Sequence, residues 1–413
     1  MLTPALPVAF PLSNPDARAS AFSEETMPTP PHPKVALCVK TFSRYGGVEL
    51  FCYRFSKYLK RNGYAVQVFC GEDATDEAKQ GRPLPEVTVL GMLRPGRFLK
   101  NLSLFRRMKR QVCALPPQTI SVSFGNFTAC TIYRSGGPHL DFLRRSLRAQ
   151  RSPLRKLSKT IRRAFSPVNW LMPLLDMDIH TNPRTRCLLA ISEKVREAMA
   201  TQFPSTRDKI AVIPNGVDTS RYNAQTFAAL RKDARIWYSL REGQRAIGFC
   251  STNFELKGLD RLIRALALLP PSCILIAVGG RNHAKYIAYA RSLGVADRVF
   301  FPGRVDDMPR FYAALDVFCH PSFYDTFGSV VAEALAMGVP AITTRDVGAC
   351  DLISNGKNGM IVPEPTPEAL AAAIQDTATI LPGQDFGCVP DDEAVFASYR
   401  ALIDKFAHPT ENA

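Results

Sequence analysis

One stretch decides the fold: residues 317–344 read VFCHPSFYDTFGSVVAEALAMGVPAITT. Its hydrophobic pattern predicts a strand at Val317–His320, a helix at Ser329–Met337 and a strand at Pro340–Thr343. A helix that joins two strands is the unit from which parallel sheets are built, because the chain must cross over before the next strand can run in the same direction.

The same alternation extends upstream to about Arg245. The pattern predicts strands at Ala246–Cys250, Cys273–Val278 and Val299–Phe301, and helices at 259–269, Ala284–Leu293 and Met308–Ala314. Sustained alternation of strands and helices indicates a doubly wound α/β domain.

An earlier unit of the same kind begins with the strand Lys34–Lys40, KVALCVK. A helical spacing of apolar residues follows, Gly63 ends that helix, and Ala65–Phe69 is the next strand. Further strands are predicted at Val87–Leu90 and Ile120–Phe124. The fold class is therefore α/β, with two Rossmann-like doubly wound domains that present the carboxyl ends of their strands to a central cleft.

The turn-rich segment IPNGVD, Ile213–Asp218, is the expected join between the two domains. We predict a disordered leader over 1–33, an N-terminal domain over 34–215, a C-terminal domain over 216–390, and a helix and tail over 391–413. The leader is rich in Pro, Ser and Ala and lacks the basic start and apolar core of a signal peptide.

Composition excludes several classes of protein. The 413 residues are 46% hydrophobic and 22% charged, which is typical of a folded chain. The longest apolar runs fall far short of the ~20 residues that a bilayer-spanning helix needs. Eleven Cys without a CxxC pair argue against zinc and against a disulfide framework, and favour a reducing compartment. Lys and Arg outnumber Asp and Glu by 15, which favours an anionic partner.

Residues that could carry chemistry gather where strands end and helices begin. Gly46 and Gly47 follow the first strand, and glycines there let an anion or a sugar approach the free N–H groups of the helix start. The plainer interpretation is a tight turn. The pattern is not GxGxxG, and no acidic residue is placed for a ribose, which argues against a nicotinamide enzyme.

A second element is the loop and helix start FYDTFGSVVAEALAM. The N–H groups of Gly328, Ser329 and Val330 are predicted to be free for phosphate oxygens. The carboxylates of Asp325 and Glu333 can accept hydrogen bonds from paired hydroxyls. The alternative is a loop cap and a solvated helix acid, although apolar residues surround Glu333 in the sequence.

A third element, NFELKG, again joins a strand to a helix. Its Lys257 could supply a point charge for a diphosphate, and the alternative is an ordinary surface lysine. Since the strands of a parallel sheet end on the same side, the three elements are expected to meet at the cleft.

These elements, in this order, resemble the retaining GT-B glycosyltransferases of family 4. The resemblance covers residues 34–400 and, within the family, points to the lipopolysaccharide core glucosyltransferase group. Its motifs are IPNGVD at 213–218, KGLDRLIRAL at 257–266, PGRV at 302–305, and HPSFYDTFGSVVAEALAMGVPAITT at 320–344 with its acid-x7-acid element.

The resemblance implies a role for each element. Glu333 corresponds to the acid that holds the nucleotide ribose hydroxyls, Asp325 to the acid that contacts the donor sugar, and Lys257 to the lysine that binds the diphosphate. By the same resemblance, 34–215 is the acceptor-binding domain and 216–390 the donor-binding domain. Further residues expected to lie against the donor are Gly46, Gly47, Gly303, Arg304, Phe327, Gly328, Ser329 and Val330.

Two departures from the family's pattern concern the donor. Asp325 stands where the family usually has Glu. Leu256 stands where an Arg commonly supplies a second cation for the diphosphate. That role would then fall to Arg304 or Arg281.

A third departure concerns acceptor activation. Thr131 stands near the position at which the core glucosyltransferase group has an Asp in its N-terminal domain. This leaves His139 or Asp141 as the polar catalyst, and we predict His139, with Asp325 and Lys257, as the catalytic residues.

The resemblance implies that a hexose, expected to be glucose from UDP-glucose, moves with retention to a lipid-linked glycan such as lipopolysaccharide core. The nucleotide sugar is a substrate, so no cofactor is expected. No metal is expected either, although Asp176-Met177-Asp178 spells DxD outside the strand–helix loops. Two other functions stay open: a GT-B epimerase that acts on a nucleotide sugar, and a catalytically silent member that binds only nucleotide or glycan.

Two cationic clusters, within 94–110 and 144–163, need an anionic partner. In the second, an apolar stripe lies between the cations, which suits an anionic membrane surface better than nucleic acid. A solvated charged face is the alternative. Together with a lipid-linked acceptor, the stripe predicts a cytoplasmic protein bound peripherally at the inner face of the cytoplasmic membrane. Its residues are Leu154, Leu157, Ile161 and Phe165.

Overall fold

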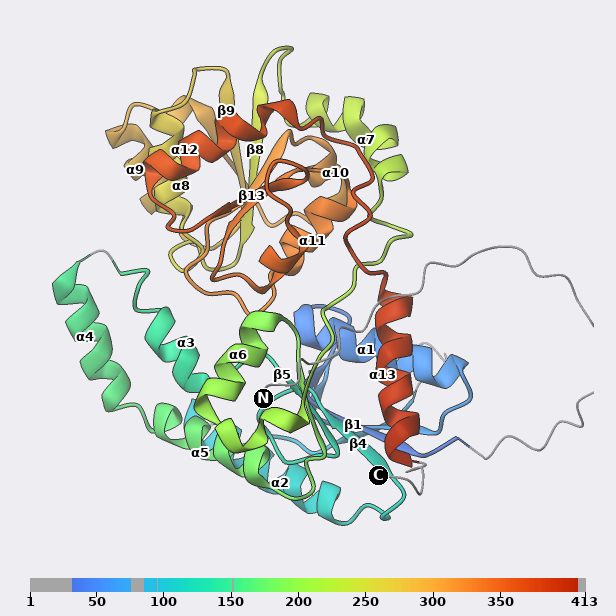
Figure 1. Ribbon diagram of the computed structural model, residues 1–413. Helices are drawn as coiled ribbons and strands as arrows, with labels where there is room; N and C mark the ends of the chain where they lie inside the picture. The colour runs from blue at the N-terminus through green and yellow to red at the C-terminus, as the bar shows by residue number, and fades with distance from the viewer. Residues whose placement is uncertain (1–31, 76–84, 95, 151, 408–413) are drawn as a thin grey trace, which may run out of the picture. The chain divides into compact units, whose positions relative to one another are not determined.

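The computed structural model describes residues 32–75, 85–94, 96–150 and 152–407, and nearly all of the predicted leader lies outside them. The described chain forms two parallel sheets, each covered by helices (Figure 1). The prediction of two doubly wound α/β domains is confirmed, whereas the domain boundaries stay a prediction.

The first sheet has the strand order β3-β2-β1-β4-β5-β6-β7, and all its pairs are parallel. Its strands are β1 (Val35–Phe42), β2 (Val66–Asp73), β3 (Glu86–Val89), β4 (Ile120–Ser123), β5 (Ile132–Ser135), β6 (Cys187–Ala190) and β7 (Ile210–Val212). Its helices are α1 (Gly47–Arg61), α2 (Arg97–Cys113), α3 (His139–Arg145), α4 (Pro153–Ala164), α5 (Pro167–Thr181) and α6 (Glu193–Gln202). We call this part the N-terminal lobe.

The second sheet has the strand order β10-β9-β8-β11-β12-β13, again with parallel pairs. Its strands are β8 (Arg245–Ser251), β9 (Cys273–Gly279), β10 (Val299–Gly303), β11 (Val317–His320), β12 (Ala341–Thr344) and β13 (Gly359–Val362). Its helices are α7 (Ala224–Trp237), α8 (Leu259–Ala267), α9 (His283–Ser292), α10 (Met308–Ala313), α11 (Ser329–Ala336) and α12 (Pro367–Asp376). We call this part the C-terminal lobe.

Helices cover both faces of the second sheet. Helices α8, α9 and α12 lie on one face, and α7, α10 and α11 lie on the other (Figure 1). Each face has its own buried hydrophobic cluster, as expected for strands that are apolar on both sides. The order of the strands reverses between β8 and β11, and loops at such a switch point form the usual binding crevice of this architecture.

The last helix, α13 (Asp392–Ala407), packs against α1 of the N-terminal lobe (Figure 1). The ring centroids of Phe51 and Phe396 lie 5.2 Å apart, and those of Phe55 and Tyr399 lie 5.4 Å apart. Offset and edge-on aromatic pairs at such distances add to the free energy gained from burial. The end of the chain is therefore part of the N-terminal lobe's core.

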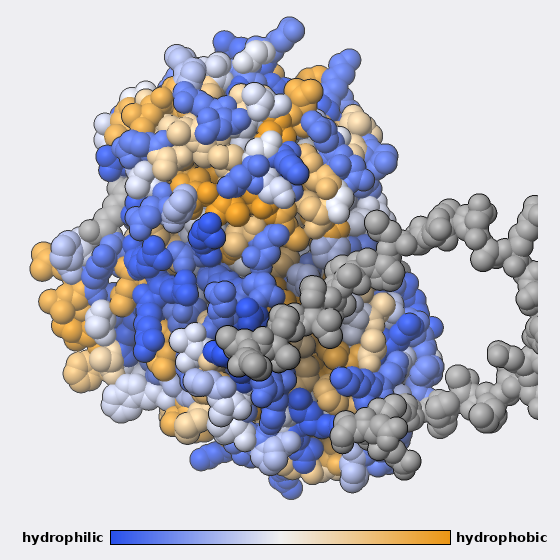
Figure 2. Space-filling view, viewed as in Figure 1, coloured by the Kyte–Doolittle hydropathy of each residue, from blue (hydrophilic) through white to orange (hydrophobic). Residues whose placement is uncertain are grey.

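None of the residues of helix α4 is buried. Its apolar stripe faces outward, with Leu154 78% exposed and Leu157 58% exposed. Figure 2 shows this apolar surface bordered by hydrophilic residues. The predicted amphipathic helix is present. No helix in the described ranges combines the length and the apolar character that crossing a membrane requires.

Candidate functional site

A cavity of about 730 Å³ lies where loops of both lobes meet. Its lining comes from the carboxyl ends of strands and the helix starts that follow them, as the sequence predicts. Of the residues predicted to bind or act there, the cavity is lined by Gly46, Gly47, Lys257, Arg304, Asp325, Phe327, Gly328, Ser329 and Val330. Gly303, Glu333 and His139 are not part of this lining.

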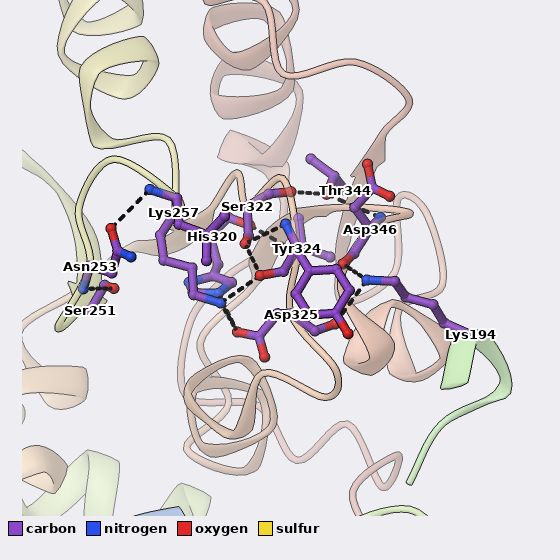
Figure 3. Close-up of polar contacts among 12 residues, drawn as sticks. Lys194, Ser251, Asn253, Lys257, His320, Ser322, Tyr324, Asp325, Thr344 and Asp346 are labelled. Atoms are coloured by element: carbon purple, nitrogen blue, oxygen red, sulfur yellow. Dashed lines mark hydrogen bonds and ion pairs between the residues drawn. The ribbon is translucent and has the colours of Figure 1, made fainter. Parts of the chain in front are cut away.

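The polar centre of the cavity is formed by the ion pair of Lys257 and Asp325 together with His320 (Figure 3). The Nζ atom of Lys257 donates to Oδ2 of Asp325 at 2.7 Å and to the carbonyl of Tyr324 at 2.8 Å. Nε2 of His320 lies 3.0 Å from the same Oδ2 atom. All three side chains are largely buried, so solvent screens the ion pair only weakly.

The protonation states in this group follow from its geometry. Burial alone would raise the pKa of Asp325, but the Lys257 ammonium and the hydrogen bond from His320 outweigh it and hold that pKa well below its usual range. Burial lowers the pKa of His320, so its imidazole is neutral near pH 7 and donates from Nε2. Asp325 is thus an anion that can accept hydrogen bonds from sugar hydroxyls.

Hydroxyl side chains hold the loop between β11 and α11. The hydroxyl of Thr344 donates to the carbonyl of Ser322 at 2.6 Å, and that of Thr343 donates to the carbonyl of His320 at 2.9 Å. Ser322 donates to the carbonyl of Tyr324 at 3.0 Å. Because these buried carbonyls have partners, the loop keeps one conformation and fixes the backbone of Asp325.

Gly328 begins helix α11 in the left-handed region, with φ of 88°. No side chain caps this helix start. A Cβ at this position would lie 2.7 Å from Cγ1 of Val347, so only glycine fits without a shift. Ser329 and Val330 also line the cavity, and the N–H groups at such a helix start have no partner within the helix and suit an anion.

Glu333 lines a smaller cavity of about 150 Å³ that shares Gly46, Gly47 and Ser329 with the larger one. The hydroxyl of Tyr312 donates to Oε2 of Glu333 at 2.8 Å. Burial raises the pKa of Glu333 to about 7, and the hydrogen bond from Tyr312 offsets part of this effect. The interpretation of Glu333 as a solvated helix acid is therefore wrong.

Lys194, at the start of α6, is a site residue that the sequence analysis missed. Its Nζ donates to the backbone carbonyl of Asp325 at 3.1 Å and to that of Asp346, and it lies 4.3 Å from the centroid of the Tyr324 ring. Burial lowers the pKa of Lys194 to about 8. The residue ties the N-terminal lobe to the loop that carries Asp325 (Figure 3).

His139 lines a separate cavity of about 410 Å³ that borders the larger one. Its Nε2 lies 3.1 Å from Oδ1 of Asn169, and its backbone N–H donates to Oδ2 of Asp176 at 2.8 Å. Asp176 is fully buried, and it also accepts a hydrogen bond from Asn126. The first acid of the DxD triplet thus lies behind the wall of this cavity, where it holds the backbone of His139 and the side chain of Asn126.

Thr131 does not face either cavity. Its hydroxyl lies 3.2 Å from that of Ser121 inside the first sheet, and it also accepts from the backbone N–H of Ser121. The side chain of Thr131 therefore points into the sheet, and the absence of a polar catalyst from this segment stays a prediction. Asn126, which lies between Ser121 and Thr131 in the sequence, does line the 410 Å³ cavity with its polar side chain.

The two arginines expected to supply the second cation that Leu256 does not provide lie in different places. Arg304 lines the larger cavity, but it is largely exposed and pairs with Asp306 at 3.0 Å. Arg281 is exposed and is not part of the lining. Within the described ranges, no three His, Cys, Asp or Glu side chains lie close enough together to hold a metal ion.

Two family models match adjoining parts of the chain: Glycosyltransferase Family 4 at residues 45–221, and Glycosyl transferases group 1 at residues 232–379. The lipopolysaccharide glucosyltransferase WaaG of Escherichia coli (strain K12) is 30% identical over 183 residues, 43% of this chain and 49% of WaaG. The D-inositol 3-phosphate glycosyltransferase of Mycolicibacterium gilvum (strain PYR-GCK) is 30% identical over 224 residues, 52% of this chain and 50% of that protein. The chain spans about half the length of these relatives.

Solved structures extend the similarity of fold to most of the chain. The crystal structure of WaaG, a glycosyltransferase involved in lipopolysaccharide biosynthesis, has a TM-score of 0.68 at 19% identity and covers 91% of this chain and 96% of its own. Anabaena Alr3699/HepE in complex with UDP and glucose has a TM-score of 0.65 at 21% identity, with 91% and 100% covered. With family matches in both lobes and this fold, the chain belongs to the GT-B glycosyltransferases of family 4.

Proposed function

We propose that the protein transfers glucose from UDP-glucose, with retention of configuration, to a lipid-linked glycan such as lipopolysaccharide core. The observation that carries the proposal is the buried Lys257–Asp325 pair beside the uncapped start of α11. An ammonium and free N–H groups suit a diphosphate, and a carboxylate beside them suits sugar hydroxyls. A nucleotide-diphosphate sugar has both groups next to each other.

In this mechanism the protein stabilises the departing diphosphate. Lys257, the α11 start and the Gly46-Gly47 turn lie around one cavity and would share the charge that develops as the glycosidic bond breaks. Glu333, in the connected cavity, would accept hydrogen bonds from the ribose hydroxyls. Among the described residues that line the larger cavity, Asp325 is the carboxylate, and both Lys257 and His320 hold its Oδ2, which favours attack of the acceptor on the same face as the leaving phosphate.

The acceptor is expected to enter from the N-terminal lobe, through the cavity that His139 and Asn126 line. The membrane surface would be met by α4, whose outward apolar stripe is flanked by cations. A protein held in this way lies peripherally at the inner face of the cytoplasmic membrane, where it reaches a lipid-linked acceptor.

The experiment that tests this function has two steps. A thermal-shift screen against UDP-, GDP-, ADP- and dTDP-sugars identifies the donor, and UDP-glucose is expected to raise the melting temperature most. Transfer of labelled glucose to a lipopolysaccharide acceptor lacking its outer sugars then tests the reaction, with full activity expected in excess EDTA. Interconversion of free nucleotide sugars would favour the epimerase. Binding of a nucleotide sugar with neither glucose transfer nor hydrolysis of the donor would favour the catalytically silent member.

A further inference from the structure

Arg134 on β5 is a buried cation to which the sequence analysis gave no role. Its side chain is 3% exposed. Nε donates to the hydroxyl of Tyr399 at 3.0 Å, Nη2 donates to Oδ1 of Asn215 at 2.5 Å, and the guanidinium stacks 4.4 Å from the centroid of the Phe51 ring. All of these partners are neutral. Among the described residues no carboxylate lies within ion-pair distance of it.

A buried charge without a counter-ion is costly in free energy, because the protein interior stabilises a charge less well than the water that it replaces. Arginine retains its charge at any physiological pH, so it does not escape this cost by losing a proton. Its neutral contacts orient the guanidinium and leave Nη1 without a hydrogen bond to any described residue. Such an arrangement is completed by an anion.

The position of Arg134 indicates which anion this is. Arg134 lines the 730 Å³ cavity together with Gly46, Gly47 and Lys257. It also lines the 410 Å³ cavity of His139, but the uncapped start of α11, which suits an anion, lies at the 730 Å³ cavity. Its partner Asn215 lines both this cavity and the smaller one that contains Glu333. The guanidinium thus lies at the cavity that contains the Lys257 ammonium, and its partner Asn215 also lines the cavity of Glu333, the carboxylate expected to hold a ribose. In a nucleotide sugar, the diphosphate is the group that joins the sugar to the ribose.

The balance of charge favours the same assignment. The Lys257 ammonium is already neutralised by Asp325 at 2.7 Å, and Leu256 supplies no charge. Arg304 is exposed and pairs with Asp306. A diphosphate carries at least two negative charges, which one shared ammonium does not balance.

We infer that Arg134 is the second cation of the donor site and that it binds the diphosphate of a nucleoside-diphosphate donor from the N-terminal lobe. The inference rests on the proposed function. Tyr399 of α13 and Asn215 of the IPNGVD turn act as positioning residues, since they hold Nε and Nη2. The C-terminal helix thereby contributes to the donor site through the residue that it orients.

Isothermal titration calorimetry tests the assignment with two ligands: the nucleoside diphosphate that binds most tightly among UDP, GDP, ADP and dTDP, and its monophosphate. In wild type the diphosphate is expected to bind more tightly. In Arg134→Gln this preference should fall by about 10- to 100-fold, the range of a charge-assisted hydrogen bond, while monophosphate affinity stays within about 2-fold. Arg134→Lys should lose part of the preference, because it keeps the charge but not the fork of donors.

The control variant is Arg291→Gln, which removes an equally charged but exposed side chain of α9 and should leave both affinities unchanged. Melting temperatures show whether each variant is folded, and Arg134→Lys carries the test if Arg134→Gln is not. An unchanged preference in the folded variants overturns the inference while the proposed function stands. A raised KM for the acceptor alone would assign the guanidinium to an acceptor anion and would also overturn it. Failure of wild type to bind any of the four diphosphates defeats the proposed function and the inference together.

Discussion

The Lys257 ammonium lies 2.7 Å from the Asp325 carboxylate, although the sequence motifs assign the two residues to different parts of a donor. The lysine is expected to meet the diphosphate and the aspartate the sugar. Their direct contact means that each neutralises the other before a ligand arrives. A donor that binds between them therefore exchanges one ion pair for two charge-assisted contacts, rather than meeting a free ammonium.

Removing the ammonium should have two effects at once. Lys257→Ala deletes a contact to the leaving diphosphate and leaves Asp325 buried without its cation, which raises the pKa of that carboxyl. We expect kcat/KM to fall by about 10²- to 10³-fold, as for loss of a transition-state donor. Glucose transfer measured at saturating acceptor checks this. Lys232→Ala, an exposed lysine of α7, should retain wild-type turnover, and near wild-type turnover in Lys257→Ala would refute the assignment.

His320 should act through Asp325 rather than on the substrate. It is buried between the rings of Phe249 and Phe318, with ring centroids 6.4 Å and 6.3 Å away, and its Nε2 donates to Asp325. His320→Phe keeps the packing but removes the donor, so we expect kcat to fall by about 10-fold. His320→Asn, whose amide can donate, should recover part of that loss. Equal kcat in the two variants would show that only packing matters.

The fold class and many elements could be predicted because their signals are local, although strands β5, β6 and β13 were not predicted. The predicted strand Val317–His320 coincides with β11, and the predicted helix start at Ser329 coincides with that of α11. Apolar periodicity and the glycine before the helix determine both ends. The site loops follow from the same signals, since each predicted loop joins a strand end to a helix start.

The residues that sequence analysis missed act across long separations in the chain. Lys194 contacts the carbonyl of Asp325, 131 positions away, and Arg134 contacts Tyr399, 265 positions away. No local pattern distinguishes these cations from the many on the surface. The orientation of Thr131 was also beyond the sequence: its side chain is turned into the sheet toward Ser121, and sequence alone does not show the direction in which a residue beside a strand points.

The pH dependence of donor binding should follow Glu333, whose pKa burial raises to about 7. Below that pH the carboxyl is protonated and accepts hydrogen bonds from a ribose diol poorly, so nucleoside diphosphate affinity should rise from pH 6 to pH 8. Binding near pH 6.5 should also release protons, because the diol favours the ionised form. Titration calorimetry in buffers of different ionisation enthalpy measures both effects. Glu333→Gln should bind more weakly and lose this part of the proton release, and an unaltered pH profile in that variant would contradict the assignment.

Gly328→Ala should cost both stability and donor affinity. A left-handed conformation costs a residue with a Cβ about 1–2 kcal/mol, and here the added carbon also crowds Val347. Gly243→Ala is the matched control, since its φ is 75° and no atom lies within 4 Å of the added carbon. Both variants should melt at a lower temperature, but only Gly328→Ala should bind the nucleoside diphosphate more weakly. Equal binding by the two would mean that the α11 start does not contact the donor.

The apolar stripe of α4 should determine attachment to membranes. Leu157 and Ile161 are 58% and 50% exposed, so the double variant Leu157→Ser/Ile161→Ser should fold normally and yet lose most binding to vesicles that contain anionic lipid. Ile236→Ser/Leu268→Ser removes two equally exposed apolar residues elsewhere and should bind like wild type. Vesicle sedimentation with anionic and with neutral lipid measures this. Because the flanking cations add about 1 kcal/mol each near a charged surface, wild-type binding should weaken as salt rises. Equal sedimentation with both lipids, or none with either, would show that α4 is merely a solvated face.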